Sequence, residues 1–455
     1  MAQPRINHFE YRAEDQRCRI HLRLEPDGSG TLFVNASQIL YLNPTAALMA
    51  RLILAETEEP RAVATVVDRY RVSTSRARED YAGLKRQLAE LVRPEGACPI
   101  CDLQLEVRPP FSVRPSAPYR MDLALTYRCN NDCAHCYNAR PRDYPEQDTS
   151  FWKRVLDRLW EIGIPHVVFT GGEPTLRPDL PDLIAHAEGL GQITGLNTNG
   201  RRLHDPRYLA RLVEAGLDHV QITVESHDAR IHDRLVGASG AWEQTRQGLQ
   251  QALATRLYVM TNTTLMRDNS PWLGGTLEFL AQLGVPTVGL NALIYSGRGA
   301  RVGTGLPESE LPSLLDLARE RTNAFRQRMI WYTPTQYCQF DPMQLELGVK
   351  GCTAALYNMC VEPDGAVLPC QSYYQTLGSL LENDWAEIWN HPLARRLREH
   401  VGLPEPCREC ALKSECGGGC PLAREAGQPS AAPRPRIGAI DSSPCLVPPD
   451  LRSVP

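Results

Sequence analysis

A regular alternation of strand-like and helix-like segments between residues 118 and 310 limits the possible fold of this chain more than any other feature. Apolar, β-branched runs recur at fairly even spacing, and amphipathic stretches such as 151–162 and 242–254 fill the gaps. This order is typical of βα units around a parallel sheet. Six runs are too few for a closed eight-stranded barrel. The sequence therefore predicts an α/β fold with an open, partial (β/α)6 barrel of TIM-like type, whose strands cover 123–127, 167–170, 193–197, 220–224, 257–264 and 288–293.

Composition places the chain among ordinary globular proteins and excludes several functional classes. Hydrophobic residues make up 42% of its 455 positions and charged residues 22%, which argues against a disordered or fibrous protein. The formal net charge of −4 gives no general attraction to nucleic acid or anionic lipid, so we expect neither as a partner. No uncharged apolar run reaches the length of a membrane-spanning helix, and residues 1–15 lack the apolar segment of a signal peptide. These features predict a cytoplasmic protein.

The chain has 15 cysteines, and in the reducing cytoplasm clustered cysteines indicate metal binding rather than disulfides. The first cluster, Cys129-x3-Cys133-x2-Cys136, directly follows the predicted strand 123–127. Three thiolates on one loop can hold three irons of a four-iron cluster and leave the fourth iron for a substrate or cofactor. Zinc with a distant fourth ligand such as His135 is the alternative. The position favours a cluster, because ligand sites in such folds gather at the carboxyl ends of strands.

A second motif, Gly171-Gly172-Glu173-Pro174, ends the next predicted strand. Glycine lets the backbone approach a ligand closely, and a carboxylate can accept a hydrogen bond from an ammonium group. A plain glycine turn is the alternative. Polar residues that could contact a cofactor also follow later strands; these residues are Asn199, Thr223, Glu225 and Arg234. For each of them, an ordinary strand-end cap or a surface charge is the alternative.

Together these motifs resemble the radical S-adenosylmethionine (SAM) enzymes, whose signature is the same cysteine spacing followed by an aromatic residue, here Tyr137. The resemblance implies a SAM-binding [4Fe–4S] cluster on Cys129, Cys133 and Cys136. It also implies that the glycine motif binds the methionine amino group, and that Thr223, Glu225 and Arg234 meet the ribose and the methionine carboxylate. The implied SAM contacts are Tyr137, Gly171, Gly172, Glu173, Pro174, Asn199, Thr223, Glu225 and Arg234, with Asn262 as a further candidate.

The carboxyl-terminal cysteines follow a third pattern, which also includes Gly365. It consists of Cys352, Cys370, Cys407-x2-Cys410-x5-Cys416-x3-Cys420 and Cys445. This order resembles the SPASM domain, which carries two auxiliary iron–sulfur clusters, whereas a pair of zinc ribbons is the alternative. Two four-cysteine clusters need eight ligands, and Cys360 is the candidate for the eighth. The resemblance implies a first auxiliary cluster on Cys352, Cys360, Cys370 and Cys420, and a second on Cys407, Cys410, Cys416 and Cys445.

Four cysteines remain outside these sets. Cys18 and Cys338 fit the role of small buried side chains. Cys98-x2-Cys101 offers two thiolates, which is half of a metal site, or two thiols without a ligand. It lies in the proline-bearing stretch 96–117, which we interpret as a linker because proline removes backbone donors and disfavours helix before each ring.

Residues 1–95 are predicted to form a small separate module. Segments 20–24 and 32–34 alternate apolar residues on either side of a turn-rich loop, which indicates a hairpin, and Asn43-Pro44 begins the first of three helices. This winged-helix-like order resembles the RiPP recognition element, which captures leader peptides of ribosomally made natural products as an added strand. A DNA-binding winged helix is the alternative, but its third helix mixes acidic with basic residues and has no stripe that could follow phosphates.

The resemblances imply a peptide-modifying radical SAM/SPASM enzyme. It would cleave SAM to a 5′-deoxyadenosyl radical and oxidatively modify a precursor peptide, for example by a crosslink or thioether, using three [4Fe–4S] clusters and a flavodoxin or ferredoxin as electron donor. An anaerobic sulfatase maturase is one alternative, although those enzymes have an Asp where Gln371 follows Cys370. A DNA-binding iron–sulfur redox regulator is another. The expected regions are 1–95 (recognition module), 96–117 (linker), 118–310 (radical SAM core) and 311–455 (SPASM domain and tail).

Overall fold

The structure is a computed structural model that describes residues 5–13, 16–35, 38–92 and 113–427. The described residues divide into two compact units, one that ends at residue 113 and another that comprises residues 114–427. Each unit has its own hydrophobic core. Within the described ranges, no helix combines the length and apolar character needed to cross a lipid bilayer.

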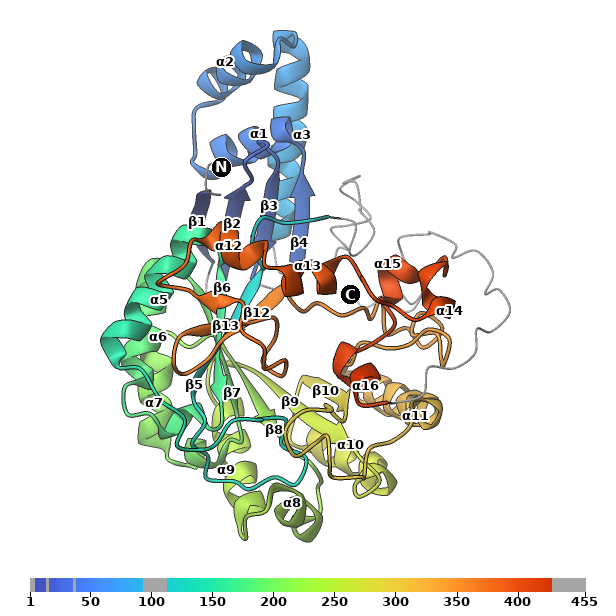
Figure 1. The fold of residues 1–455 in the computed structure, drawn as a ribbon. Helices are drawn as coiled ribbons and strands as arrows, with labels where there is room; N and C mark the ends of the chain where they lie inside the picture. The colour runs from blue at the N-terminus through green and yellow to red at the C-terminus, as the bar shows by residue number, and fades with distance from the viewer. Residues whose placement is uncertain (1–4, 14–15, 36–37, 93–112, 428–455) are drawn as a thin grey trace. The chain divides into compact units, whose positions relative to one another are not determined.

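The amino-terminal unit is a four-stranded antiparallel sheet followed by three helices (Figure 1). The predicted hairpin is confirmed, with Leu22 of one strand paired to Leu32 of the next. The sequence analysis missed the two outer strands of the sheet, β1 and β4. The elements are β1 (Arg5–Ala13), β2 (Gln16–Leu24), β3 (Gly30–Val34), β4 (Gln38–Leu42), α1 (Pro44–Leu54), α2 (Glu59–Tyr70) and α3 (Thr74–Val92).

Local sequence explains how the helices of this unit begin and pack. The Asn43 side chain accepts a hydrogen bond from the Ala46 backbone N–H at 2.9 Å, which caps α1 as predicted. Helix α3 buries one apolar face on the core formed with β2 and β3, and its buried residues are Ala77, Tyr81, Leu84, Leu88 and Leu91.

The second unit is built on a ten-stranded sheet in the order β11-β10-β9-β8-β7-β6-β5-β12-β13-β14. The six predicted strands are confirmed, and all six are parallel to their neighbours in this set. They are β5 (Arg120–Thr126), β6 (His166–Gly171), β7 (Ile193–Thr198), β8 (His219–Thr223), β9 (Tyr258–Leu265) and β10 (Thr287–Ala292). Because β11 and β14 are the ends of the sheet, the barrel is open, as predicted.

Helices between the strands cover one face of this sheet (Figure 1). The predicted helices 151–162 and 242–254 correspond to α5 and α9. The α-helices are α5 (Thr149–Ile162), α6 (Leu180–Leu190), α7 (Pro206–Glu214), α8 (Ala229–Val236), α9 (Ala241–Leu253), α10 (Leu273–Gln282) and α11 (Leu311–Ala324). Short 3-10 helices are η1 (Pro174–Leu176), η2 (Arg201–His204), η3 (Ser270–Trp272) and η4 (Glu308–Glu310).

The sheet continues beyond the six predicted strands at both ends. Strand β11 (Arg328–Trp331) pairs in parallel with β10, after α11. On the other side, β12 (Asn358–Val361) pairs in parallel with β5, so a late hairpin extends the sheet beside its first parallel strand. The remaining elements are β13 (Ala366–Leu368), β14 (Gly378–Ser379), α12 (Trp385–Trp389), α13 (Pro392–Arg398), α14 (Glu405–Arg408), α15 (Lys413–Cys416) and α16 (Pro421–Glu425).

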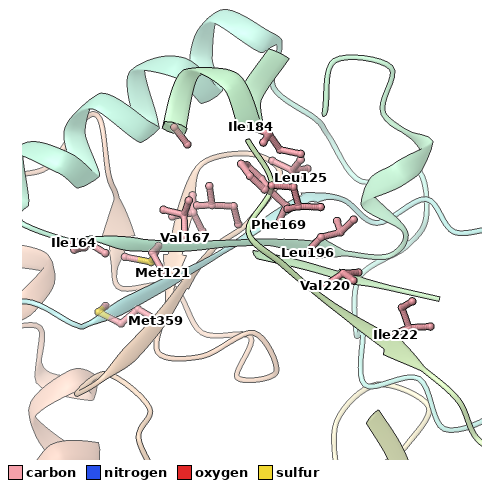
Figure 2. Close-up of a cluster of buried hydrophobic side chains, with 14 of the residues drawn as sticks. Met121, Leu125, Ile164, Val167, Phe169, Ile184, Leu196, Val220, Ile222 and Met359 are labelled. Carbon is pink, nitrogen blue, oxygen red and sulfur yellow. The ribbon is translucent and has the colours of Figure 1, made fainter. Parts of the chain in front are cut away.

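Alternation along each parallel strand separates an apolar face from a polar face. The apolar side chains pack under the helices in one buried cluster, part of which Figure 2 shows. Phe169, Leu196 and Ile222 are fully buried in this cluster and come from three adjacent strands. Intervening residues alternate with these and belong to the opposite face, which is mostly polar; they include Thr170, Asn197, Gln221, Asn262 and Asn291.

Candidate functional site

The loop that carries Cys129, Cys133 and Cys136 leaves the carboxyl end of β5 and is held by backbone hydrogen bonds on both sides. The Asp132 N–H donates to the Val236 carbonyl at 2.8 Å, at the end of α8. The Arg298 N–H donates to the Cys136 carbonyl at 2.9 Å from the segment that follows β10. The loop therefore has a defined path between two other strand-end connections.

Three arginines bind the polar groups of this loop. Arg142 Nη1 donates to the Cys129 carbonyl at 2.8 Å. Arg201 Nη1 donates to Asn131 Oδ1 at 2.8 Å, and Arg298 Nη1 donates to Asp132 Oδ1 at 2.7 Å. Guanidinium groups at these positions favour negative charge on the loop, as anionic thiolates would supply. The sequence analysis missed all three because isolated arginines carry no spacing signal.

The three thiols of the loop are half-buried and lie close enough to affect one another. The pKa of Cys129 is raised to about 11, mainly by burial and to a smaller extent by the nearby Glu173 and Cys136. Burial, followed by the proximity of Cys136 and Cys129, also raises the pKa of Cys133. Both shifts favour the protonated thiol in Cys129 and Cys133, and a metal that binds there must displace those protons.

The arrangement fits an iron–sulfur cluster better than a single ion. Among the described residues, no three His, Cys, Asp or Glu side chains converge as one metal ion requires. Zinc needs such convergence, because its ligands surround one centre at about 2.0–2.3 Å. A four-iron cluster gives each thiolate its own iron, so its ligands stand further apart.

The glycine turn after β6 packs directly on the end of β5. Gly171 has a φ of +126°, and a Cβ there would lie 2.2 Å from the Thr126 carbonyl oxygen. A Cβ on Gly172 would lie 2.4 Å from the Arg128 carbonyl oxygen. The approach is fixed by hydrogen bonds from the Gly172 N–H to Thr126 at 2.7 Å and from the Glu173 N–H to Arg128 at 2.8 Å. Only glycine fits both positions, so the turn and the cysteine loop are one packed unit.

Glu173 joins this unit to the end of β7. The carboxylate is fully buried, and burial raises its pKa. Oε1 accepts hydrogen bonds from the Thr175 hydroxyl at 2.6 Å and the Thr198 hydroxyl at 2.7 Å, and Oε2 accepts one from the Asn199 N–H at 2.8 Å. Asn199 Nδ2 in turn donates to Asn130 Oδ1 at 2.6 Å, beside Cys129. In the ligand-free chain Glu173 therefore organises neighbouring strand ends, and Pro174 begins η1 directly after it.

The end of β8 also meets the cysteine loop. Glu225 is buried, and its Oε2 accepts a hydrogen bond from the Thr264 N–H at 3.0 Å. His135 Nε2 lies 2.9 Å from Glu225 Oε1, off the line that a hydrogen bond needs. His135 was considered only as a zinc ligand, and its proximity to Glu225 was not predicted. Thr223 is half-buried at the last position of β8.

Arg234 and Asn262 were also predicted as contacts. Arg234 is exposed on α8, whereas its neighbour Leu235 is buried. Asn262 lies in β9 on the polar face of the sheet, and its buried Oδ1 has no hydrogen-bond partner. Such an orphaned acceptor is a natural contact for a bound ligand or water.

Tyr137, directly after Cys136, contacts a distant part of the chain. Its hydroxyl donates to Gln371 Oε1 at 3.3 Å, and Gln371 directly follows Cys370. The first cysteine loop and a carboxyl-terminal cysteine are thus linked by one side-chain hydrogen bond. Gln371 carries a neutral amide, which cannot serve as a carboxylate base at this position.

Two family models match the chain. Residues 123–287 match the radical SAM superfamily, and residues 352–411 match SPASM, an iron–sulfur cluster-binding domain. The chain therefore contains a radical SAM region and a SPASM region. The radical SAM match begins in β5 and ends at the start of β10, so it covers the strand ends described above.

Solved structures with the same fold are distant in sequence. Streptococcus suis SuiB bound to its precursor peptide SuiA has a TM-score of 0.68 and 17% identity, with 91% of this chain and 96% of that chain covered. SuiB bound to S-adenosylmethionine has a TM-score of 0.66 at 16% identity, with 90% and 95% covered. The structure called native anSMEcpe with bound AdoMet has a TM-score of 0.55 at 16% identity, with 68% and 91% covered. The SuiB match thus takes in about a quarter more of this chain, which is about the size of its amino-terminal unit.

The SPASM cysteines occupy two groups. In the first, burial and the neighbouring Cys420 and Cys370 thiols raise the pKa of Cys352. Burial also raises the pKa of Cys370 to about 12, with Cys420 again adding. Cys360 is fully buried in β12 and packs with Ala124, Tyr127 and Leu368.

The second group contains Cys407, Cys410 and Cys416. Burial and the Cys410 thiol raise the pKa of Cys407, and burial raises that of Cys416, with Cys407 adding. Cys445, like Cys98 and Cys101, lies outside the described residues.

An ion pair between the half-buried Arg140 and the fully buried Glu362 joins the SPASM hairpin to the radical SAM core. Arg140, four residues after Cys136, donates from Nε and Nη2 to the two carboxylate oxygens of Glu362, both at 2.8 Å. The Tyr127 hydroxyl donates to the same carboxylate at 3.0 Å. The guanidinium also lies 5.2 Å from the Tyr144 ring and 5.3 Å from the Tyr374 ring. This ion pair is therefore one of several polar contacts between the two regions.

Proposed function

We propose that this radical SAM/SPASM enzyme oxidatively modifies a ribosomally synthesised precursor peptide, which it captures by the leader on residues 1–95. It would act in the cytoplasm, with neither nucleic acid nor membrane as a partner, and would receive electrons from a flavodoxin or ferredoxin. The observation that carries the proposal is the convergence of the three-cysteine loop, the glycine turn and the ends of β7 and β8. Hydrogen bonds and the contact between His135 and Glu225 join them into one packed unit.

The residues of this unit fit a cluster with SAM bound to it. Cys129, Cys133 and Cys136 are the proposed cluster ligands, and Arg142, Arg201 and Arg298 hold their loop. The proposed SAM contacts are Tyr137, Gly171, Gly172, Glu173, Pro174, Asn199, Thr223, Glu225 and Arg234. When bound, the reduced cluster and SAM supply a 5′-deoxyadenosyl radical that takes a hydrogen atom from the peptide.

The chain's own residues then position the reactants and exclude water. The turn at Gly171 and Gly172 packs against the end of β5, and the methionine end of SAM would lie beside it. Neutral amide and hydroxyl groups of the polar sheet face, including the unpartnered Asn262 Oδ1, can hydrogen-bond the cofactor or a peptide backbone.

The amino-terminal unit offers two edge strands for leader capture. Strands β1 and β4 are the outer strands of its sheet, and an edge strand presents unpaired backbone groups that an extended peptide can meet. On β4, Gln38 and Ile39 are exposed. Helix α3 has no free cationic face in its first turns, because Arg76 pairs with Asp80 at 3.0 Å and Arg78 pairs with Glu59 at 3.6 Å. These ion pairs favour peptide over DNA.

We further propose that the SPASM domain binds two auxiliary clusters, which would make three [4Fe–4S] clusters in total. The proposed ligands of the first are Cys352, Cys370 and Cys420, with Cys360 as the fourth. Those of the second include Cys407, Cys410 and Cys416, with Cys445 as the fourth candidate from the sequence pattern. Such clusters would accept the electrons released by a net two-electron oxidation of the peptide.

A sulfatase maturase is less well supported. Sulfatase maturases share an Asp at the position that Gln371 occupies in this chain. Gln371 accepts a hydrogen bond from Tyr137. The amino-terminal unit is an additional part that a sulfatase maturase does not need. A redox regulator does not need a SAM-binding site, so it would not require the glycine turn that packs on the cysteine loop.

The test combines SAM cleavage with peptide modification. Reconstituted protein is incubated anaerobically with SAM, dithionite and the peptide encoded beside its gene, and 5′-deoxyadenosine and the peptide mass are measured. We expect 5′-deoxyadenosine and a peptide lighter by about two hydrogens. Cys133→Ala should abolish both and keep roughly two thirds of the iron, whereas Cys18→Ala, in β2 of the amino-terminal unit, should behave as wild type. Full cleavage by Cys133→Ala, or no cleavage by cluster-loaded wild type, would refute the proposal.

A further inference from the structure

Cys338 lies outside the matched SPASM residues, yet the structure brings the turn that carries it against Cys416 of the second group of SPASM cysteines. It sits in the turn at residues 337–339, where the Gln339 N–H donates to the Gln336 carbonyl at 2.8 Å. The adjacent Tyr337 N–H donates to Cys416 Sγ at 3.5 Å, and Cys416 Sγ donates to the Thr335 carbonyl at 3.5 Å. Both contacts place the Cys338 turn directly against Cys416.

The turn is anchored rather than loosely placed. The Thr335 N–H donates to the Lys350 carbonyl at 2.9 Å, and the Lys350 N–H donates to the Tyr337 hydroxyl at 2.8 Å. Trp331, in β11, donates from Nε1 to the Thr335 hydroxyl at 3.0 Å. Strand β11 and the segment before Cys352 therefore fix where Cys338 lies.

The glycines after Cys416 allow this close approach. Gly419 has a φ of +73°, and a Cβ there would lie 2.8 Å from Gln336 Cγ and 3.5 Å from the Pro334 carbonyl oxygen. A larger residue would push the cysteine loop away from the turn that carries Cys338. The two segments are thus built to touch.

Electrostatic proximity separates the cysteines into the same two groups. Burial raises the pKa of Cys338, and the thiols that raise it further are Cys416 and Cys407. The Cys410 thiol raises the pKa of Cys407, and the Cys407 thiol raises the pKa of Cys416. Cys352, Cys370 and Cys420 form the other group.

We propose that Cys338 is a protein ligand of the second auxiliary cluster, together with Cys407, Cys410 and Cys416. The inference rests on the proposed function for the presence of that cluster, and it replaces Cys445 as the fourth ligand. Four thiols, each releasing one proton on binding iron, complete the ligand set within the described residues. The chain would then hold this cluster between the end of its parallel sheet and α14–α15, independently of its tail.

The first experiment maps thiol protection. Cluster-loaded protein, kept anaerobic, is alkylated with iodoacetamide before and after removal of iron by a chelator, and the modified cysteines are identified by mass spectrometry. Cys338 should be protected in loaded protein and modified after chelation, whereas Cys18 should react to the same extent in both samples. Equal modification of Cys338 in both samples would overturn the proposal. No variant is needed, so misfolding cannot obscure the result.

The second experiment counts iron in a background where Cys129, Cys133 and Cys136 are all alanine, which leaves about eight irons on the auxiliary clusters. Adding Cys338→Ala should remove about four irons or change the electron paramagnetic resonance signal of one cluster. Cys338→Ser, the conservative variant, should keep more iron with an altered signal. Adding Cys445→Ala should leave iron and signal as in the parent.

An unchanged Cys338→Ala protein, or loss of one cluster in Cys445→Ala alone, would refute the assignment. If both variants lose iron, the alkylation map decides between direct and indirect effects. Neither experiment requires turnover. Protein that holds its auxiliary clusters but fails to cleave SAM would contradict the proposed function and leave the ligand assignment standing.

Discussion

Replacing Gly172 by alanine tests whether the glycine turn forms part of the SAM site. A Cβ at this position would lie 2.4 Å from the Arg128 carbonyl oxygen and 2.6 Å from that of Tyr127. Since Cβ contacts essentially never fall below 3.0 Å, the turn or the end of β5 must move by about 0.6 Å. Both obstacles are backbone atoms, so no side-chain rotation relieves the overlap.

The expected magnitude follows from this displacement. Overpacking of this kind costs about 1–3 kcal/mol. Because Gly172 lies between the cysteine loop and Glu173, we expect the cost to appear mainly in ligand placement. SAM affinity should fall roughly 10- to 100-fold, or about 1.4–2.7 kcal/mol, while cluster content stays near wild type.

The assay is equilibrium binding of SAM to anaerobically reconstituted protein, with iron content measured on the same samples. Gly189→Ala is the matched control, because nothing lies within 4 Å of its added Cβ in α6. It should bind SAM normally. SAM affinity of Gly172→Ala within twofold of wild type, at equal iron content, would refute the assignment of this turn to the cofactor.

Three further predictions concern stability. Arg140→Gln should destabilise the second unit by about 3–5 kcal/mol in denaturant titrations, because it leaves the Glu362 carboxylate buried without its cation. The double variant Arg140→Gln/Glu362→Gln should recover part of that loss. If the two substitutions instead cost the sum of their separate losses, the two side chains are not coupled. Gly83→Ala should stabilise the amino-terminal unit by about 0.5–1 kcal/mol in calorimetry, because Gly83 lies in α3 and nothing lies within 4 Å of the added Cβ. Destabilisation would mean that the added methyl group clashes with a neighbouring atom. Burial lowers the pKa of His219 to about 4, so the unfolded chain takes up its proton first and stability should fall from about pH 6.5 towards pH 4. His219→Gln should flatten that decline, measured on cluster-free protein, and an unchanged pH profile would argue against a neutral buried imidazole.

Much of the second unit was predictable because its signals are local. The alternation of apolar strand segments with amphipathic helices located all six core strands, and the spacing of Cys129, Cys133 and Cys136 located the loop after β5. In the amino-terminal unit, the cap at Asn43 followed from the Asn43-Pro44 pair, and the buried face of α3 followed from helix periodicity. Outer strands β1 and β4 were missed: β1 carries charged residues along its length, and Gln38–Leu42 of β4 lacks a clean apolar–polar alternation.

Long-range contacts had no such signal. The ion pair between Arg140 and Glu362, and the hydrogen bond between Tyr137 and Gln371, join residues more than two hundred positions apart. They exist because β12 pairs with β5, and no short-range pattern encodes which strand becomes the neighbour of β5. Arg142, Arg201 and Arg298 reach the cysteine loop by the same kind of tertiary approach.

By itself, the sequence determined which residues could do chemistry and where the six core strands lie, since cysteine spacing and apolar periodicity act over a few residues. Only the tertiary structure decided which of those residues meet. Cys338 illustrates the difference: nothing in its neighbourhood distinguishes it from a small buried side chain, and its contact with the Cys416 loop arises from the anchoring of its turn to β11 and Lys350. Such contacts depend on how distant segments pack against one another, and packing is a property of the whole fold.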